Sequence, residues 1–598
     1  MSTKPALPWL RKLCSLYERH DNSVFACTAE PHPNGVLVSL ELDRGKMYLL
    51  IQSKGSAKFY AETASMCISI HQPADAGPAP GNGELVARQF IGILSRADKG
   101  DVEVTSRCTQ SPAPTATAIR VSDADARAAR DAAADEIKWA SFLAYKAIVT
   151  EDLYPHVGPL GELVDEREIL DGWRATVKRI ANKTAPPKLG LYVHAPFCTV
   201  ACTFCYCGKT DKFNRSMMET YLKKLHKEIE LFAPIFTEST FTSVYFGGGT
   251  PSLFSPPAMR ELFSSLYGAL HVPDGTQIIF EGNPDSLNEA KIKVLANEGR
   301  VTRLTIGVQT LDDTVQAIVK RFNTPDQVAS AIAAARHHEI EHVNCDLMAG
   351  MPEQTLESFQ KDVEFLLTLE PDSLHLNGYR PLPRTQLGGS SPPMPEAQIK
   401  LRDEMLQWGQ ERLKQEGHRD ESGQGQRRTR NAANIQEYDL RRQNSSLLGL
   451  GYSARSHSFG SHFYSPDSSG GFDAGLNQDL NGERRWRAVQ VDTREEQHKY
   501  LVSNFRTGFD KAEFQALFGE DVAGVVPKRL EKLMNMGMVS MDDDRVNTHV
   551  NSPLEDLTFR TFLYSDKHLE RATKVWGHEY DPDFDYTTQL RRLTEATG

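Results

Sequence analysis

The sequence predicts an α/β protein built on a partial (β/α)6 barrel, with an N-terminal α+β domain and a small C-terminal helical domain. Two observations support the barrel. Between residues 188 and 390, short apolar runs alternate with helical patterns, and repeated β–α units imply a parallel sheet. Glycine and polar residues also follow several of the apolar runs, at the strand ends where ligands bind in such barrels.

The individual elements of the barrel follow from apolar periodicity and from helix start and stop signals. The predicted strands, the second with its glycine loop, are 188–196, 239–249, 276–284, 301–310, 342–352 and 373–383. The predicted helices are 256–270, 286–299, 324–340 and 356–371.

Residues 1–150 are predicted to form a separate domain of unknown role, joined to the barrel by a linker at 151–187. Its alternating stretch 35–52 favours a β-hairpin, and 65–71 favours another strand. Helices are expected at 84–97 and 123–149.

Composition indicates a cytoplasmic enzyme without nucleic-acid or membrane partners. The formal net charge of −11 gives no general attraction for nucleic acid or anionic lipid. No apolar run approaches the ~20 residues that span a bilayer, and the first residues lack the apolar core of a signal peptide.

Four cysteines, Cys198, Cys202, Cys205 and Cys207, follow the first predicted strand of the barrel, which Pro196 ends. Thiolates this close together can converge on one iron–sulfur cluster or on one zinc ion. Zinc usually takes two separated pairs of ligands, and no second pair follows at a suitable distance. Nine cysteines in 598 residues also argue against a disulfide framework. The spacing therefore favours three cluster ligands, with the fourth iron open.

The pattern CTVACTFCYC resembles the CxxxCxFC signature of radical S-adenosylmethionine (SAM) enzymes, and its last cysteine is similar to the oxygen-independent coproporphyrinogen III oxidase branch. The resemblance implies a radical SAM barrel in which Cys198, Cys202 and Cys205 hold a [4Fe–4S] cluster, with Cys207 as a non-ligand neighbour. It further implies that SAM chelates the open iron. The cluster, reduced by a donor such as flavodoxin or ferredoxin, would cleave SAM to a 5′-deoxyadenosyl radical.

The resemblance also assigns residues to SAM. It places the backbone of the glycine motif beside the methionyl group, a carboxylate on the SAM amino acid moiety, and other side chains around a first and a second SAM. These residues are Tyr192, Phe204, Gly247, Gly248, Gly249, Thr250, Glu281, Gln309, Arg321 and Asp346. Taken singly, a glycine triplet also fits a plain turn, and each acid fits a helix cap or a structural ion pair.

The resemblance extends over roughly residues 185 to 565. It implies an active-site closing segment at 391–480, with Gln436 at a matching polar position, then a helical domain at 481–565 and a tail at 566–598.

The chain departs from the family pattern in two ways. Arg380 and Arg455 stand where the porphyrinogen oxidase has small or apolar residues beside the adenosyl groups. Two extra cations there fit an acidic substrate or a SAM carboxylate, and each also fits a surface salt bridge. The N-terminal Tyr-Thr-Ser-Tyr-Pro arm of the oxidase has no equivalent before Cys198.

Three functional hypotheses follow. The first is a radical SAM enzyme acting on a small, acidic metabolite, as a methyltransferase that performs C-methylation or cyclopropanation. The second is oxidative decarboxylation of a tetrapyrrole propionate, as in the porphyrinogen oxidase. The third, a haem chaperone, is disfavoured because that branch typically lacks the Cys-x-Cys extension found here at Cys205 and Cys207.

His337, His338 and His342 gather at the end of one predicted helix. No acidic or cysteine partner follows them in a metal-binding pattern, so the sequence favours exposed histidines over a metal site.

Overall fold

The computed structural model describes six N-terminal strands and residues 154–576, with gaps at 156, 382–384, 391–393, 421–426, 430–443, 506, 536 and 550–562. The chain divides into two compact units, and each is treated by itself below. The larger unit is Leu153–Leu563, and the smaller one combines Met1–Asp152 with Tyr564–Gly598.

The larger unit is organised around one 13-stranded sheet. Six parallel strands lie side by side in chain order at its centre: β8 (Leu189–Ala195), β9 (Ser243–Gly248), β10 (Gln277–Gly282), β11 (Arg303–Gln309), β12 (His342–Ala349) and β13 (Ser373–Gly378). A further parallel strand, β16 (Ser446–Leu450), pairs with β8. The six predicted β–α strands are therefore confirmed, and the described strands form an open rather than a closed barrel.

Antiparallel strands extend the sheet on both sides. Next to β13 lie β15 (Arg427–Thr429) and β14 (Arg419–Asp420). Beyond β16 lie β17 (Ser456–Ser458), β18 (His462–Pro466), β19 (Trp486–Gln490) and β7 (Glu162–Val164). Among the described strands, β14 and β7 each pair on one side only.

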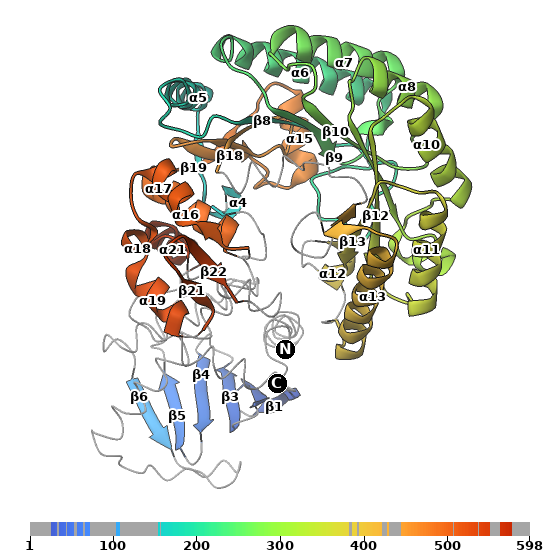
Figure 1. The fold of residues 1–598 in the computed structure, drawn as a ribbon. Coiled ribbons are helices and arrows are strands. Elements are labelled where there is room, and N and C mark those ends of the chain that lie inside the picture. Colours follow the sequence, from blue (N-terminus) through green and yellow to red (C-terminus); the bar gives the residue numbers. More distant parts are fainter. Residues whose placement is uncertain are drawn as a thin grey trace. The chain divides into compact units, whose positions relative to one another are not determined.

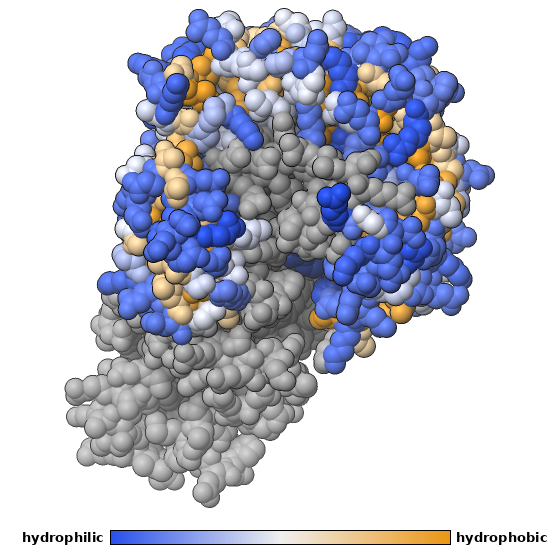
Figure 2. All heavy atoms as spheres, in the orientation of Figure 1, coloured by the Kyte–Doolittle hydropathy of each residue, from blue (hydrophilic) through white to orange (hydrophobic). Residues whose placement is uncertain are grey.

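Helices cover the outer face of the parallel strands (Figure 1). They are α6 (Arg215–Phe232), α7 (Pro256–Ala269), α8 (Glu289–Asn297), α10 (Pro325–His337), α11 (Leu356–Thr368) and α13 (Glu396–Gln415). Strand β8 is almost wholly buried because helices and loops cover both of its faces, as is typical of parallel strands. Side-chain caps begin several of these helices, including Thr324 and Gln327 as a capping box on α10. The visible outer surface over these helices is mostly hydrophilic, with scattered hydrophobic residues (Figure 2).

Three segments differ from the sequence-based expectation. The segment 151–187 is not a plain linker: it contains α4 (Val157–Leu160), β7 and α5 (Glu166–Ala181). Trp173 on α5 is buried, and its indole nitrogen donates a hydrogen bond to the Tyr464 hydroxyl of β18. Both contacts pack this segment against the sheet. Strand β19 pairs with β18 although it lies within the range expected for the C-terminal domain. Helix α6 has no counterpart among the predicted helices, although Asn214 caps it.

The C-terminal part of the larger unit is helical, with a small sheet in the order β20-β22-β21. Its elements are α16 (Thr493–Asn504), β20 (Phe509–Asp510), α17 (Lys511–Phe518), α18 (Val522–Val525), α19 (Pro527–Asn535), β21 (Val539–Met541) and β22 (Arg545–Thr548). α15 (Phe472–Leu480) precedes this part, and the shorter helices α9 (Asp313–Val319) and α12 (Gln386–Ser390) lie near the barrel strands in sequence.

The smaller unit contains a six-stranded antiparallel sheet in the order β1 to β6. Its strands are β1 (Ala26–His32), β2 (Gly35–Leu42), β3 (Gly45–Gln52), β4 (Ala57–Thr63), β5 (Met66–His71) and β6 (Glu103–Arg107). The hairpin predicted at 35–52 is confirmed by the pairing of β2 with β3. The helices predicted at 84–97 and 123–149 lie outside the described residues. Helix α21 (Asp566–Trp576) falls in the range expected as a tail.

Candidate active site

Four thiols lie on the loop that leaves the carboxyl end of β8. Cys198 is buried, Cys202 and Cys205 are half-buried, and Cys207 is exposed. The amide of Cys198 donates to the carbonyl of Thr210 at 3.0 Å, which closes the loop at its base. This closed loop holds all four thiols in one short stretch of chain.

The cysteine loop also reaches the far side of the barrel mouth. The amide of Thr203 donates to the Val319 carbonyl at 3.1 Å, and the amide of Leu387 donates to the Thr203 carbonyl at 2.8 Å. Phe204 packs against an apolar cluster that includes Met351 and Tyr379. The loop therefore spans the mouth from β8 to the segments that follow β11 and β13.

The thiols differ in how readily they ionise. Burial raises the pKa of Cys198 to about 11. A hydrogen bond from the Cys207 thiol, opposed by burial and aided by Lys209, lowers the pKa of Cys205, and the same pairing raises the pKa of Cys207. Burial alone would lower the pKa of Lys209. The nearby thiols, Cys205 first among them, have the larger combined effect, so the pKa of Lys209 is raised. Cys205 is thus prepared as a thiolate, whereas Cys207 is stabilised as a thiol.

The glycine loop at the end of β9 lies directly above the ring of His194. Gly248 has a φ of +108°, and a Cβ added there would lie 2.5 to 2.8 Å from the imidazole atoms. Burial lowers the pKa of His194 to about 4, so the ring is neutral at pH 7. Its Nε2 donates to the Gly208 carbonyl at 2.7 Å, and its Nδ1 accepts from the Tyr192 hydroxyl at 2.9 Å. His194 thereby joins the glycine loop to the end of the cysteine loop.

Glu281, at the end of β10, contacts the same glycine loop. One carboxylate oxygen accepts from the amide of Gly248 at 3.3 Å, and the other accepts from the hydroxyl of Tyr245. A Cβ on Gly247 would lie 2.9 Å from this carboxylate. The carboxylate is therefore positioned from two sides, at the edge where the resemblance puts the SAM amino acid moiety.

A chain of hydrogen bonds links Arg321 to the first cysteine. Its guanidinium donates to the Gly307 carbonyl and, at 3.0 Å, to Asn283 Oδ1. Asn283 Nδ2 donates to Thr250 Oγ1 at 3.2 Å, and that hydroxyl lies 3.3 Å from the Cys198 sulfur. The Nε of Arg321 is buried and has no hydrogen-bond partner among the described residues.

Two further assigned residues lie on β11 and β12: Gln309 is the last residue of β11, and Asp346 lies within β12, short of its end. Gln309 has a φ of +69° beside an irregularity in the pairing of β11 with β12, and such bulges often re-aim a side chain near an active site. Asp346 accepts from Asn344 at 2.7 Å and lies 3.5 Å from the imidazole of His375. Both residues are half-buried.

The two arginines that depart from the family pattern follow the two outer parallel strands. Arg380 is exposed and follows β13, next to the buried Tyr379. Arg455 is half-buried and follows β16, the parallel neighbour of β8. Gln436 lies outside the described residues.

The residues present fit an iron–sulfur cluster and SAM. Thiolates are the ligands that hold such clusters. The loop carries four cysteines, which is enough to bind three iron atoms through one thiolate each. The glycine loop gives close backbone approach, and the orphaned Arg321 Nε offers a donor to an anionic group such as a carboxylate. In accordance with this donor set, the radical SAM superfamily profile matches residues 192–366. The protein is a radical SAM enzyme with a [4Fe–4S] cluster and SAM as cofactors.

Similar proteins of known name indicate the family of radical SAM enzymes to which this chain belongs. The oxygen-independent coproporphyrinogen III oxidase of Pseudomonas aeruginosa is 31% identical over 390 residues, which are 61% of this chain and 82% of that enzyme. The Escherichia coli enzyme of the same name is 26% identical over 434 residues, 68% of this chain and 92% of the relative. This chain belongs to the oxygen-independent coproporphyrinogen III oxidase family.

A solved structure supports the fold. Coproporphyrinogen III oxidase from Escherichia coli, described as a radical SAM enzyme, matches with a TM-score of 0.56 at 23% identity. The match covers 68% of this chain and 95% of that chain. The predicted partial radical SAM barrel is therefore confirmed.

Three site residues were missed from the sequence: His194, Asn283 and Tyr245. His194 and Asn283 each follow a predicted strand residue already assigned to the site, in LYVH and EGNP. Their closeness in sequence to Tyr192 and Glu281 is the signal from which these two residues could have been predicted. Most of their hydrogen-bond partners lie on separate segments, such as Gly208 for His194, Arg321 for Asn283 and Glu281 for Tyr245, and the chain order alone does not identify these contacts.

Replacing Gly248 with valine is expected to weaken SAM binding about tenfold or more, which corresponds to the strain of a disfavoured backbone conformation plus a steric clash. The added side chain must displace the His194 ring, which disturbs both the glycine loop and the cysteine loop that this ring joins. Calorimetric titration with SAM checks this. Gly275→Val is the matched control, because Gly275 also has a positive φ, +78°, but a Cβ there meets no atom within 4 Å. Equal losses in the two variants would contradict the role of the clash.

Proposed function

We propose that Cys198, Cys202 and Cys205 are the three cluster ligands and that Cys207 is a neighbour that donates a hydrogen bond to Cys205. The exposure of Cys207 supports this division, because the other three thiols of the loop are buried or half-buried. When bound, the reduced cluster and SAM supply a radical that removes a hydrogen atom from an unactivated carbon.

The proposal extends to the surroundings of SAM. Glu281 and the Gly247–Gly249 backbone would hold the methionyl group, and Tyr192 would contact the same SAM. A second SAM would lie near Phe204, Gln309, Arg321 and Asp346. Phe204 lies on the cysteine loop, Gln309 and Asp346 lie on the neighbouring strands β11 and β12, and Arg321 follows α9.

For the substrate we propose coproporphyrinogen III, with oxidative decarboxylation of its propionate side chains. One observation carries this proposal: a relative named for this reaction is 31% identical over 390 residues and is covered to 82% of its length. It favours decarboxylation over the C-methylation or cyclopropanation of a small metabolite that the sequence analysis put first.

The overall change is balanced in atoms and charge. Each propionate that reacts, R–CH2–CH2–COO⁻, becomes a vinyl group, R–CH=CH2, with release of CO2, one proton and two electrons. One hydrogen atom leaves with the adenosyl fragment as 5′-deoxyadenosine, and the remaining electron passes to an acceptor. Arg380 and Arg455 are suited to pair with propionate carboxylates, because a guanidinium binds a carboxylate through two parallel hydrogen bonds.

Reduced, cluster-loaded enzyme with SAM and coproporphyrinogen III is expected to form CO2 and 5′-deoxyadenosine in equal amounts. Arg380→Ala and Arg455→Ala are expected to keep uncoupled SAM cleavage but to lose about tenfold or more in CO2 formation, since a hydrogen bond to a charged group is worth about 1.5–3 kcal/mol. Arg260→Ala is the control: Arg260 pairs with Glu298 on the outer helices and should have no effect.

Other product patterns discriminate between the hypotheses. 5′-Deoxyadenosine without CO2 would reject this substrate while leaving the radical chemistry intact. S-adenosylhomocysteine as a product would instead indicate methyl transfer. A lower melting temperature with unchanged coupling in the arginine variants would assign those residues a structural role.

A further inference from the structure

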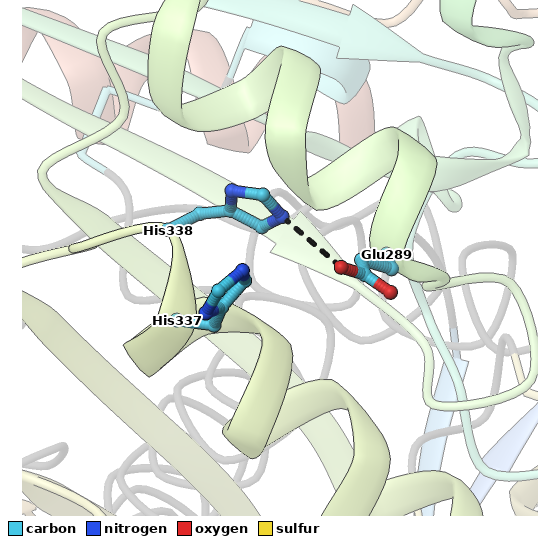
Figure 3. A group of neighbouring side chains, drawn as sticks. All are labelled: Glu289, His337 and His338. Carbon is cyan, nitrogen blue, oxygen red and sulfur yellow. Dashed lines mark ion pairs between the residues drawn. The ribbon is translucent and has the colours of Figure 1, made fainter.

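Two neighbouring outer helices bring two histidines and a glutamate together (Figure 3). His337 is the last residue of α10, and His338 is its C-cap. Glu289 is the first residue of α8, directly after the N-cap Asn288. The sequence pattern showed no acidic partner for these histidines, because the partner belongs to a different helix.

The three side chains present their ligand atoms to one another. One imidazole nitrogen from each histidine and one carboxylate oxygen all lie within 4.8 Å of one another. The Nε2 of His338 is 3.7 Å from the Glu289 carboxylate, too far for a hydrogen bond. This nitrogen is buried, and within the described part of the chain it has no hydrogen-bond partner.

We propose that Glu289, His337 and His338 form a binding site for a divalent transition-metal ion, with zinc as the first choice. Two imidazoles and one carboxylate are a ligand set that zinc accepts, at bond lengths of about 2.0–2.2 Å. Ligand atoms around a tetrahedral zinc lie roughly 3.4 Å apart. Small side-chain rotations therefore suffice to close the present spacing, because Glu289 and His337 are exposed and not packed into the core.

A surface hollow adjoins this site. Its lining includes Glu289 and His337 and adds the side chains of Asp285, Asp326, Gln327 and Ser330. Three protein ligands leave one zinc position open, and this hollow offers it water or a further oxygen ligand. A bound ion would fasten the start of α8 to the end of α10.

The competing explanation is a plain charge pair. A glutamate at a helix N-terminus and histidines at a helix C-terminus are each favoured by the helix dipole, without any metal. That explanation accounts for a glutamate and two histidines at these helix ends, but it does not require a ligand atom of His337 to lie within 4.8 Å of those of His338 and Glu289.

The test is calorimetric titration of Zn²⁺ into full-length, cluster-loaded protein without an affinity tag. The wild type is expected to bind one more Zn²⁺ than His337→Ala/His338→Ala. Glu289→Gln is expected to weaken this site about tenfold or more, the scale of losses when a metal site loses a supporting group. Because the readout is metal binding, the result does not depend on the substrate or the radical reaction.

His226→Ala is the matched control. His226 also lies beside a single glutamate on the outer helices, with its Nδ1 3.8 Å from Glu261, but without a second histidine. This variant should bind zinc as the wild type does. Equal zinc stoichiometry in the wild type and the double histidine variant would overturn the proposal, as would an equal loss in the His226 variant. Circular dichroism melting confirms that each variant is folded.

Discussion

Serine at Cys198, Cys202 or Cys205 is expected to abolish the [4Fe–4S] cluster, whereas serine at Cys207 is expected to retain it. Losing one thiolate leaves an iron under-coordinated, and the hydroxyl of serine does not replace a soft sulfur ligand. At Cys207, serine keeps a hydrogen-bond donor beside the Cys205 sulfur, which is the role assigned to Cys207 here. All SAM cleavage should disappear in the first three variants and persist in the fourth.

Iron and sulfide content after anaerobic reconstitution, together with the electron paramagnetic resonance spectrum of the reduced protein, measures the result. Cys345→Ala is a further control, because Cys345 is buried in β12 and belongs to the core of the barrel. If Cys207→Ser lost as much iron as Cys202→Ser, the assignment of three ligands would be wrong.

Methionine at Arg484 is expected to destabilise the larger unit by about 3–5 kcal/mol, the scale for removing one partner of a buried ion pair. Arg484 forms ion pairs with Glu228 on α6 and Asp479 on α15, and both carboxylates are almost wholly buried. Burial raises the pKa of Glu228, and the guanidinium opposes that rise. Without the arginine, two buried carboxylates remain uncompensated.

Urea unfolding, followed by far-ultraviolet circular dichroism, measures this effect. The neighbouring Arg485→Met is the matched control: its side chain is 55% exposed, and its partner Asp467 keeps Arg487. That variant should lose less than about 1 kcal/mol. Adding Glu228→Gln to Arg484→Met should restore part of the stability. No rescue by Glu228→Gln would show that the loss comes from packing rather than from buried charge.

This ion cluster also supports the active site at a distance. Glu228 accepts from the amide of Gly451 at 2.8 Å, at the end of β16. Tyr221, on the same helix, donates to the carbonyl of His194 at 2.6 Å. The cluster thus positions the strand end that precedes Arg455 against the strand that carries the cysteine loop.

The barrel and its cofactors could be predicted from the sequence because their signals are local. Apolar runs, helix patterns and the cysteine spacing each lie within a short stretch of chain, and β8 to β13 lie within the predicted strand ranges. The hydrogen bonds of Asn283 with Arg321 and Thr250 join three separate segments. Such contacts depend on strand order and register, which short-range patterns do not encode.

The same reason explains what the sequence missed elsewhere. Helix α5 and strand β7 were expected as a linker, because β7 is short and finds its partner β19 only far along the chain. The grouping of His337 and His338 with Glu289 likewise needs two helices side by side.

Among the described residues, no helix combines the length and the apolar content that crossing a bilayer requires.

The two edge strands of the main sheet, β14 and β7, affect how readily this fold accommodates insertions and deletions. In a closed barrel, strand number and tilt fix the diameter, so its width changes only if the whole sheet is rebuilt. Here β14 and β7 are joined to the sheet on one side each among the described strands. Segments at these two edges are free to lengthen, shorten or shift without breaking a ladder between parallel strands. Changes in the length of these edge segments therefore leave the parallel strands before the cysteine and glycine loops unchanged.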